Sequence, residues 1–234
     1  MNQRYPDQGH PMARARPVQL AFVVLLLGLA SPLAQAASGT VSTCTWAGFN
    51  AVYGAAPVGG TITFACAGTI TPPATVTISS NTVLDGNGNA VVFDGGGNKR
   101  LFVVSSGVSL ELRRLTLRRG YGSHEDLGGG AVRNDGGTLT VVDSVLSANR
   151  GYQGGAIYNA GTLTVRGTTF ANNLASLSGG AIEHESGSLV VSDCTFSDNE
   201  TSGWGGAIFN YSTARIENSA FLRNQANELG GGID

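Results

Sequence analysis

A four-residue phrase, Gly-Gly-Ala-Val/Ile, returns at a nearly fixed interval in the C-terminal half of this chain. It starts 25, 25 and 26 residues apart, and a related phrase, GGGID, follows after another 25, the five starts being Gly129, Gly154, Gly179, Gly205 and Gly230. A second phrase, Phe/Leu-x-x-Asn, falls between them and ends at Asn149, Asn173, Asn199 and Asn224. A period of this length predicts a solenoid, in which each repeat forms one coil and buries its apolar face only against its neighbours.

Apolar residues occupy the same positions in every repeat, and the positions between them vary. The clearest apolar column contains Leu117, Leu146, Phe170, Phe196 and Phe221. This alternation is typical of strands with one buried face, and stacking in register would place equivalent residues about 4.8 Å apart. We therefore predict an all-β fold with about three short strands per repeat, a single-stranded parallel β-helix of about 25-residue rungs. The handedness of parallel crossovers favours the right-handed coil.

Asparagines recur at two corners of the predicted coil. One column holds the four asparagines of the second phrase, and the other holds Asn134, Asn159 and Asn210. Stacked asparagines can hydrogen-bond along the column and tolerate the left-handed backbone of a tight corner, and the Gly-Gly pairs supply a third corner. His184 falls in the second column, so we interpret it as a corner residue; a metal site with the flanking Glu183 and Glu185 is the alternative.

The chain divides into three segments. Residues 1–36 are predicted to be a signal peptide, with basic Arg14 and Arg16, an eleven-residue apolar run over 20–30 and a small-x-small cleavage site at 34–36. The apolar run is too short for a transmembrane helix, although a retained anchor is the alternative. Residues 37–105 are predicted to form an N-terminal cap with irregular first rungs, and 106–234 the regular repeats. The repeats stop inside a new rung, so we expect either a longer native chain or self-association through this open rung.

Export would place the cysteines in an oxidising compartment. Cys44 and Cys66, 22 residues apart in the predicted cap, are expected to form a disulfide. Cys194 falls between inward-facing positions and is interpreted as a small buried core residue, with a reactive or metal-binding thiol as the alternative.

The combination of GGAI and FxxN resembles the repeats of the chlamydial polymorphic outer membrane proteins. It is equally similar to bacterial right-handed parallel β-helix repeat proteins, in which a segment like GGTITFACAGTITPPATVTISSNTVLDGNG precedes the repeats. The resemblance covers most of residues 44–234. It implies a secreted or surface-exposed, adhesin-like protein of the bacterial outer membrane or cell envelope.

The fold is also compatible with a lyase or glycoside hydrolase acting on acidic polysaccharides. Such chemistry needs converging carboxylates, or carboxylates that bind calcium beside an arginine base. None of four polar groups is assigned a catalytic, metal-binding or cofactor-binding role: Asp143 with Asp193, Asp198 with Glu200, the loop His124-Glu125-Asp126, and the outward column Arg113, Arg166 and Glu217.

A binding surface is the favoured interpretation. The position after the Val/Ile of each Gly-Gly-Ala phrase is predicted to face outward, and it is occupied by Arg133, Tyr158, Glu183 and Phe209. The exposed rings would contact a sugar or a protein, unless a neighbouring loop stacks on them. With 14 basic and 16 acidic residues, the chain gives no indication of a nucleic-acid partner. We therefore expect a non-catalytic scaffold for a polysaccharide or a host or neighbouring surface protein, with an enzyme or a ligand-free spacer as alternatives.

Overall fold

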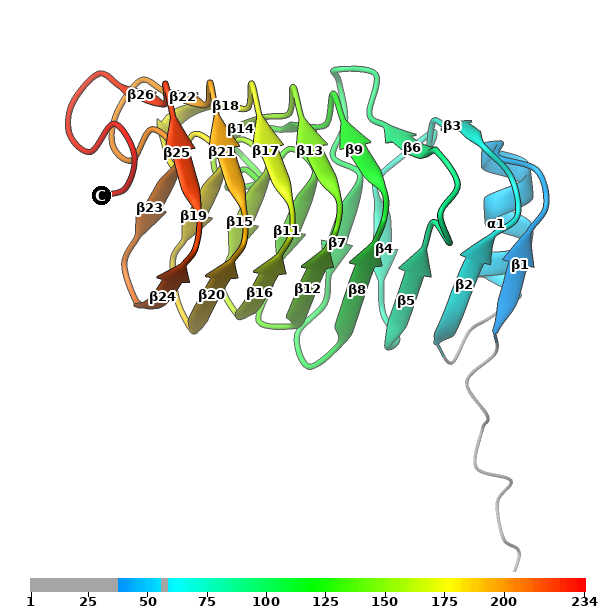
Figure 1. The fold of residues 1–234 in the computed structure, drawn as a ribbon. Helices are drawn as coiled ribbons and strands as arrows, with labels where there is room; N and C mark the ends of the chain where they lie inside the picture. The colour runs from blue at the N-terminus through cyan, green and yellow to red at the C-terminus, as the bar shows by residue number, and fades with distance from the viewer. Residues whose placement is uncertain (1–37, 56–58) are drawn as a thin grey trace, which may run out of the picture. The chain divides into compact units, whose positions relative to one another are not determined.

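The strands pair in parallel, each with the equivalent strand of the next coil, for example Leu139 with Leu163 and Val141 with Val165. The computed structural model describes residues 38–55 and 59–234, and the predicted signal peptide lies outside the described residues. The strands stack in four sheets, which we name A to D (Figure 1). The described residues thus form the parallel β-helix that the repeats predict.

Sheet A has eight strands and sheet B has seven. The strands of sheet A are β1 (Gly39–Val41), β2 (Gly60–Phe64), β5 (Thr82–Asp85), β8 (Ser109–Arg113), β12 (Thr138–Val142), β16 (Thr162–Arg166), β20 (Ser188–Ser192) and β24 (Thr213–Glu217). The strands of sheet B are β3 (Gly68–Ile70), β6 (Val91–Asp94), β9 (Thr116–Arg118), β13 (Val145–Ser147), β17 (Thr169–Ala171), β21 (Thr195–Ser197) and β25 (Ala220–Leu222).

Sheet C has six strands and sheet D has five. The strands of sheet C are β4 (Val76–Ile78), β7 (Phe102–Val104), β11 (Val132–Asn134), β15 (Ile157–Asn159), β19 (Ile182–His184) and β23 (Ile208–Asn210). The strands of sheet D are β10 (Tyr121–Gly122), β14 (Arg150–Gln153), β18 (Leu174–Ser178), β22 (Glu200–Thr201) and β26 (Gln225–Ala226). A complete coil therefore has four strands, in the order C, A, B, D, where the sequence predicts about three.

The core is built from the apolar columns that the sequence predicts. Phe170 and Phe196 are fully buried, and their rings stack in parallel with centroids 4.8 Å apart; Phe196 stacks in the same way on Phe221. Burying one such side chain stabilises the fold by roughly 1.5–3 kcal/mol. Cys194 is also buried, as expected, and its burial raises the pKa of the thiol.

The asparagine columns bond along the stack, but they do not supply the left-handed corners. The side chains of Asn149 and Asn173 hydrogen-bond to each other, as do those of Asn173 and Asn199. In the first column, the positive φ angles belong to the residues just before the asparagines, such as Ala148 (52°) and Asn172 (55°). The asparagine side chain reaches the next coil from an ordinary backbone, so the expected left-handed asparagines were wrong.

A short helix covers the coil at the β1 end of the solenoid (Figure 1). Helix α1 (Trp46–Gly54) begins after Thr45, whose hydroxyl accepts a hydrogen bond from the backbone N–H of Gly48. The ring of Phe49 packs 5.2 Å from that of Phe93 in the core. The Cys44–Cys66 disulfide joins the start of this helix to the end of β2, so the predicted bond is present in the structure.

Candidate functional site

The predicted outward column on sheet C is largely covered. Tyr158 is only 6% exposed and Glu183 is fully buried, whereas Arg133 and Phe209 are half-buried. Two residues near the end of the sheet D segments contact this face. The ring of Trp204, just before a Gly-Gly phrase, lies 6.3 Å from that of Phe209, and Gln153 Nε2, at the end of β14, donates to Glu183 Oε1 at 3.4 Å. The expected exposure of Tyr158 and Glu183 was wrong, since both side chains are buried and Glu183 is contacted by Gln153.

Burial leaves the Glu183 carboxylate poorly solvated. Its Oε2 atom has no hydrogen-bond partner among the described residues. Burial raises the pKa of Glu183 to about 7, and the nearby charge of Glu185 adds to this shift. The face that carries Tyr158 and Glu183 is therefore an internal contact in this structure and offers little surface to a ligand.

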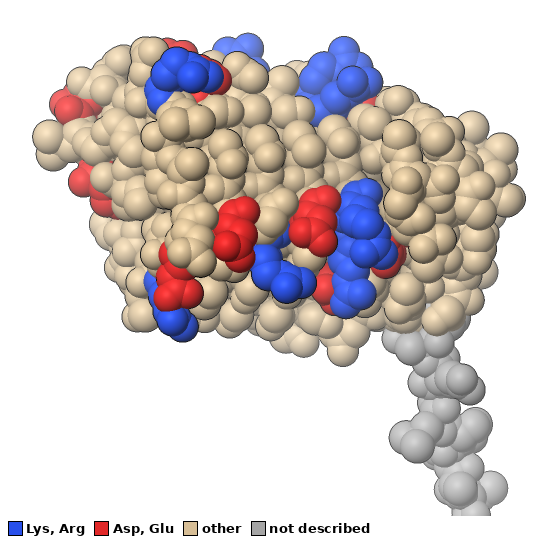
Figure 2. Space-filling view, viewed as in Figure 1, with Lys and Arg blue, Asp and Glu red and all other residues tan. Residues whose placement is uncertain are grey.

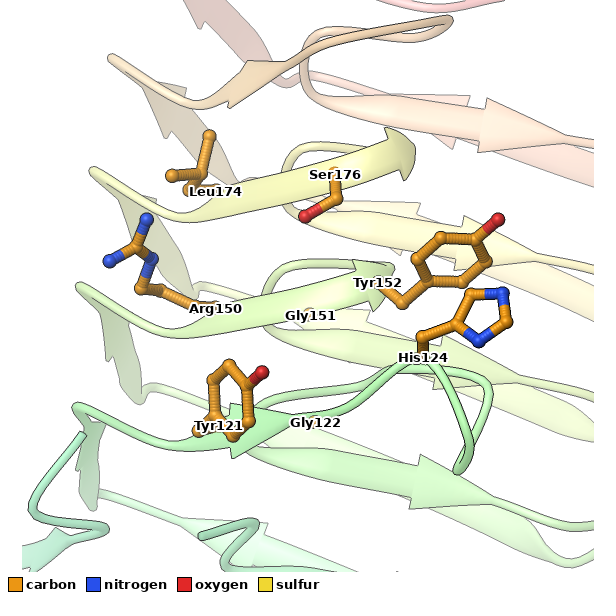
Figure 3. A pocket seen from close by; sticks show the side chains of 8 residues that line it. All are labelled: Tyr121, Gly122, His124, Arg150, Gly151, Tyr152, Leu174 and Ser176. Atoms are coloured by element: carbon orange, nitrogen blue, oxygen red, sulfur yellow. The ribbon is translucent and has the colours of Figure 1, made fainter. Parts of the chain in front are cut away.

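A groove of about 370 Å³ lies on sheet D, which precedes sheet C of the next coil along the chain (Figure 3). Two rows of side chains flank a floor formed by the backbone of Gly122 and Gly151. The rows run across three successive coils, with Tyr121, Arg150 and Leu174 on one side and His124, Tyr152 and Ser176 on the other.

Strand pairing fixes the first row. Tyr121 pairs with Arg150, and Arg150 pairs with Leu174, so the three side chains lie one coil apart. Tyr121 is 43% exposed, and Arg150 is exposed as well. At position 151 the floor must be glycine, because a Cβ there would lie 2.3 Å from the carbonyl oxygen of Gly154.

A buried arginine holds the loop that supplies His124 to the second row. Arg100 donates from Nη2 to the carbonyl oxygen of Gly128 at 2.6 Å and from Nε to that of Gly129 at 3.0 Å. It thereby anchors the end of the His124 loop, and the ring of His124 packs edge-on against that of Tyr152, with centroids 4.2 Å apart. Of the predicted polar loop, only His124 lines the groove; Glu125 and Asp126 are exposed beside it.

Most residues of this groove were not singled out from the sequence. Tyr121, Arg150, Tyr152, Leu174 and Ser176 belong to the fourth sheet, which the sequence analysis did not predict. Their position in the sequence could have indicated them. They directly follow the asparagine corner, as in Asn149-Arg150-Gly151-Tyr152, where every second side chain of an extended segment points outward.

The other candidate polar groups lie on the A and B side of the coil. Figure 2 shows charges of both signs close together over the strands of sheet A and the edge it shares with sheet B. Arg113 pairs with Glu111 at 2.6 Å, and Glu217 pairs with Arg215. Asp143 and Asp193 occupy exposed corner positions with φ angles of 49° and 56°. The outward charges of sheet A therefore neutralise one another in part and do not converge on one point.

The described residues contain no cluster of three or more His, Cys, Asp or Glu side chains that could hold a metal ion. His184 is fully buried in the second ladder, where Asn159 Nδ2 lies 2.9 Å from its Nδ1. This is the corner position that the repeats predict for it.

A second depression, of about 410 Å³, lies at the last coil. It is lined by Trp204, Phe209, Asn210, Tyr211, Leu229 and Asp234. Phe209 belongs to the predicted binding face and is half-buried, and its ring lines this depression. It is more apolar than the groove on sheet D and lacks a basic side chain.

The described part of the chain contains no helix long and apolar enough to cross a membrane. Neither the curated proteins nor the solved structures provide a significant match. The model of one family, described as the right-handed beta helix region, matches residues 62–234, about three quarters of the chain. With its parallel sheets, stacked coils and repeat spacing, this chain belongs to the right-handed β-helix family.

Proposed function

We propose that this protein is an exported, non-catalytic scaffold that binds a glycan chain along the groove on sheet D. The observation that carries the proposal is the double row of side chains across three coils, with an aromatic ring on each side of a glycine floor. Tyrosine rings offer an apolar face to a sugar and a hydroxyl at the edge, so they suit such a ligand.

The direction of the groove supports a chain-like ligand. Successive coils repeat at about 4.8 Å, a spacing similar to the length of one sugar unit, so a linear glycan can place successive units over successive coils. The contacts of Tyr121, Arg150 and Leu174 would then act on neighbouring units of one chain.

The chemistry of the lining favours binding over turnover. Hydrolysis of a glycosidic bond requires a pair of carboxyl groups on either side of it. The eight residues that line the groove include no Asp or Glu, and the outward charges on sheet A are partly paired with each other. Asp198 and Glu200 line a separate pocket, but Asp198 is paired there with Arg223 at 2.6 Å, so this pocket does not offer two free carboxyl groups for hydrolysis.

The signal peptide predicted over residues 1–36 supports the same function, because the glycans that such a scaffold would meet are on cell surfaces or outside cells. We propose that the chain is cleaved after Ala36 and functions at the bacterial cell surface or in the medium. N-terminal sequencing of the protein recovered from outside the cytoplasm tests this, with Ala37 expected as the first residue. A cytoplasmic protein that retains residues 1–36 would overturn the proposal of export.

The binding experiment uses a panel of linear polysaccharides and the purified protein. We expect saturable binding without release of reducing or unsaturated sugar. The double variant Tyr121→Ser/Tyr152→Ser should weaken binding at least about tenfold while its far-ultraviolet circular dichroism stays unchanged. Tyr211→Ser, which changes an exposed tyrosine outside the groove, is the matched control. Turnover of any polysaccharide, or equal loss in the control, would refute the proposal.

A further inference from the structure

Arg150 is unusual among the arginines of the described residues because its guanidinium group has no carboxylate partner. Seven others form ion pairs: Arg113, Arg114, Arg118, Arg119, Arg133, Arg215 and Arg223. Arg100 donates to backbone carbonyls instead. Within the described part of the chain, only Arg150 and Arg166 are left without such partners, and Arg150 lines the groove on sheet D.

The surroundings of Arg150 leave its charge uncompensated at the centre of the groove. Its neighbours one coil away on either side are Tyr121 and Leu174, neither of which carries a charge at neutral pH. The first acidic side chain along the same column is Glu200, which pairs with Leu174 and so lies two coils from Arg150, at about 9.6 Å. The guanidinium group is therefore free to form a charge-assisted contact with a ligand.

We propose that the groove selects glycans that carry an anionic group, and that Arg150 binds this group. The inference rests on the proposed function and names its ligand class: a linear acidic polysaccharide, with a carboxylate or a sulfate on the sugar unit that lies over the middle coil. A planar guanidinium can hold either group with two parallel hydrogen bonds, which a lysine cannot do.

The rest of the groove fits the remaining parts of such a sugar. Across the floor from Arg150 lie Tyr152 and Ser176 (Figure 3). The Ser176 hydroxyl points toward the floor and can hydrogen-bond to a sugar hydroxyl, whereas the Tyr152 hydroxyl lies at the outer end of its ring. Tyr121 and Leu174 offer apolar contact to the two adjoining units. The middle coil would thus bind the anionic group through Arg150, and the coils on either side would contact the neighbouring sugars.

The test compares matched pairs of oligosaccharides by titration calorimetry. One pair is an oligogalacturonide and its methyl ester; the other is a sulfated oligosaccharide and its desulfated form. We expect the wild-type protein to bind at least one charged member about tenfold or more tightly than its neutral partner, and salt to reduce the difference. The two pairs together distinguish a carboxylate from a sulfate.

Three variants locate the selectivity. Arg150→Gln should bind charged and neutral members equally, and Arg150→Lys should recover only part of the preference. Arg166→Gln, the matched control on sheet A, should behave like the wild type. Equal binding of charged and neutral members by the wild type would overturn the anionic preference and leave glycan binding intact. Loss of preference in Arg166→Gln would assign it to general charge attraction, and binding to no glycan at all would refute the proposed function itself.

Discussion

The side chain and the backbone N–H of Asn149 both donate to the side-chain oxygen of Asn173, one coil further along, at 3.0 Å each. Asn173 repeats this contact with Asn199, and its side-chain nitrogen also donates to the carbonyl oxygen of Leu146 at 2.9 Å. All three asparagines are buried. Each ladder residue therefore satisfies polar groups of two neighbouring coils, and its removal affects both.

Asn173→Ala should lower the free energy of unfolding by about 2–5 kcal/mol. The substitution leaves the backbone N–H of Asn149 and the carbonyl oxygen of Leu146 buried without their partners, and such groups are costly. Denaturant titration measures the loss. Asn172→Gly is the matched control, since Asn172 is exposed with a φ of 55°; a loss as large as that of Asn173→Ala would contradict the assigned role of the ladder.

His184→Asn should stabilise the protein by about 1–2 kcal/mol at neutral pH. Two buried side-chain atoms of the second asparagine column, His184 Nε2 and Asn210 Oδ1, have no hydrogen-bond partner among the residues that the structure describes. An asparagine at 184 can accept from Asn159 and donate to Asn210, as Asn134 donates to Asn159 at 2.6 Å. The substitution would then remove the unpaired His184 Nε2 and give Asn210 Oδ1 a donor.

The gain from His184→Asn should increase in acid. Burial lowers the pKa of His184 in the folded state, so the unfolded chain binds more protons below about pH 6.5 and the wild type loses stability as the pH falls. Thermal unfolding at pH 5 and pH 8 measures this difference. His124→Asn, on the exposed groove wall, is the control. A gain from His184→Asn that is the same at both pH values would show that burial does not hinder protonation of this histidine.

Glu183→Gln should change stability in the opposite pH range. Because the folded pKa of Glu183 is raised from 4.5 to about 7, the folded state binds more protons than the unfolded state between these values. The free energy of unfolding of the wild type therefore falls as the pH rises through this window, by roughly 3 kcal/mol for a shift of this size. Glutamine keeps the shape and carries no charge, so the variant should be more stable at pH 8 and similar near pH 4.5.

Chemical denaturation from pH 4 to pH 8 tests this expectation for Glu183. Glu228→Gln changes an exposed glutamate and serves as the control, with no more than about 0.5 kcal/mol of change at any pH. A constant difference between Glu183→Gln and the wild type across the range would mean that the carboxylate is ionised at no cost in the folded protein.

The apolar columns made the coil predictable. Sheet D could not be predicted in the same way, because its inward positions do not form such a column. Phe170 and Phe196 recur in register and alternate with polar residues, so their inward direction follows from the sequence. In β14 the inward position is Gly151, which has no side chain, so the alternation that reveals a strand is missing. Tyr158 illustrates a second limit: alternation gives the direction of a side chain, but not the segment that covers it.

Helix α1 was missed for a different reason. Thr45 is a favourable N-cap, and Trp46, Phe49 and Tyr53 follow at helical spacing, so the signal was present. The prediction of irregular rungs over residues 37–105 does not include this nine-residue helix, because the sequence on both sides of it is strand-rich. The groove could be anticipated only from the positions that follow the ladder corner, because its residue types differ from one coil to the next.

The segments from the asparagine corner to the next Gly-Gly phrase differ in length, whereas the segments from sheet A to the asparagine corner do not. Ten residues separate Leu139 from Asn149, Leu163 from Asn173 and Leu189 from Asn199. From the ladder position to the next Gly-Gly phrase the chain takes nine residues after Gly120, five after Asn149 and six after Asn173. The longest of these connections carries His124, at the edge of the groove. Insertions at this place leave the stacking register untouched, so evolution or an engineer can exchange whole recognition loops here while the framework stays the same.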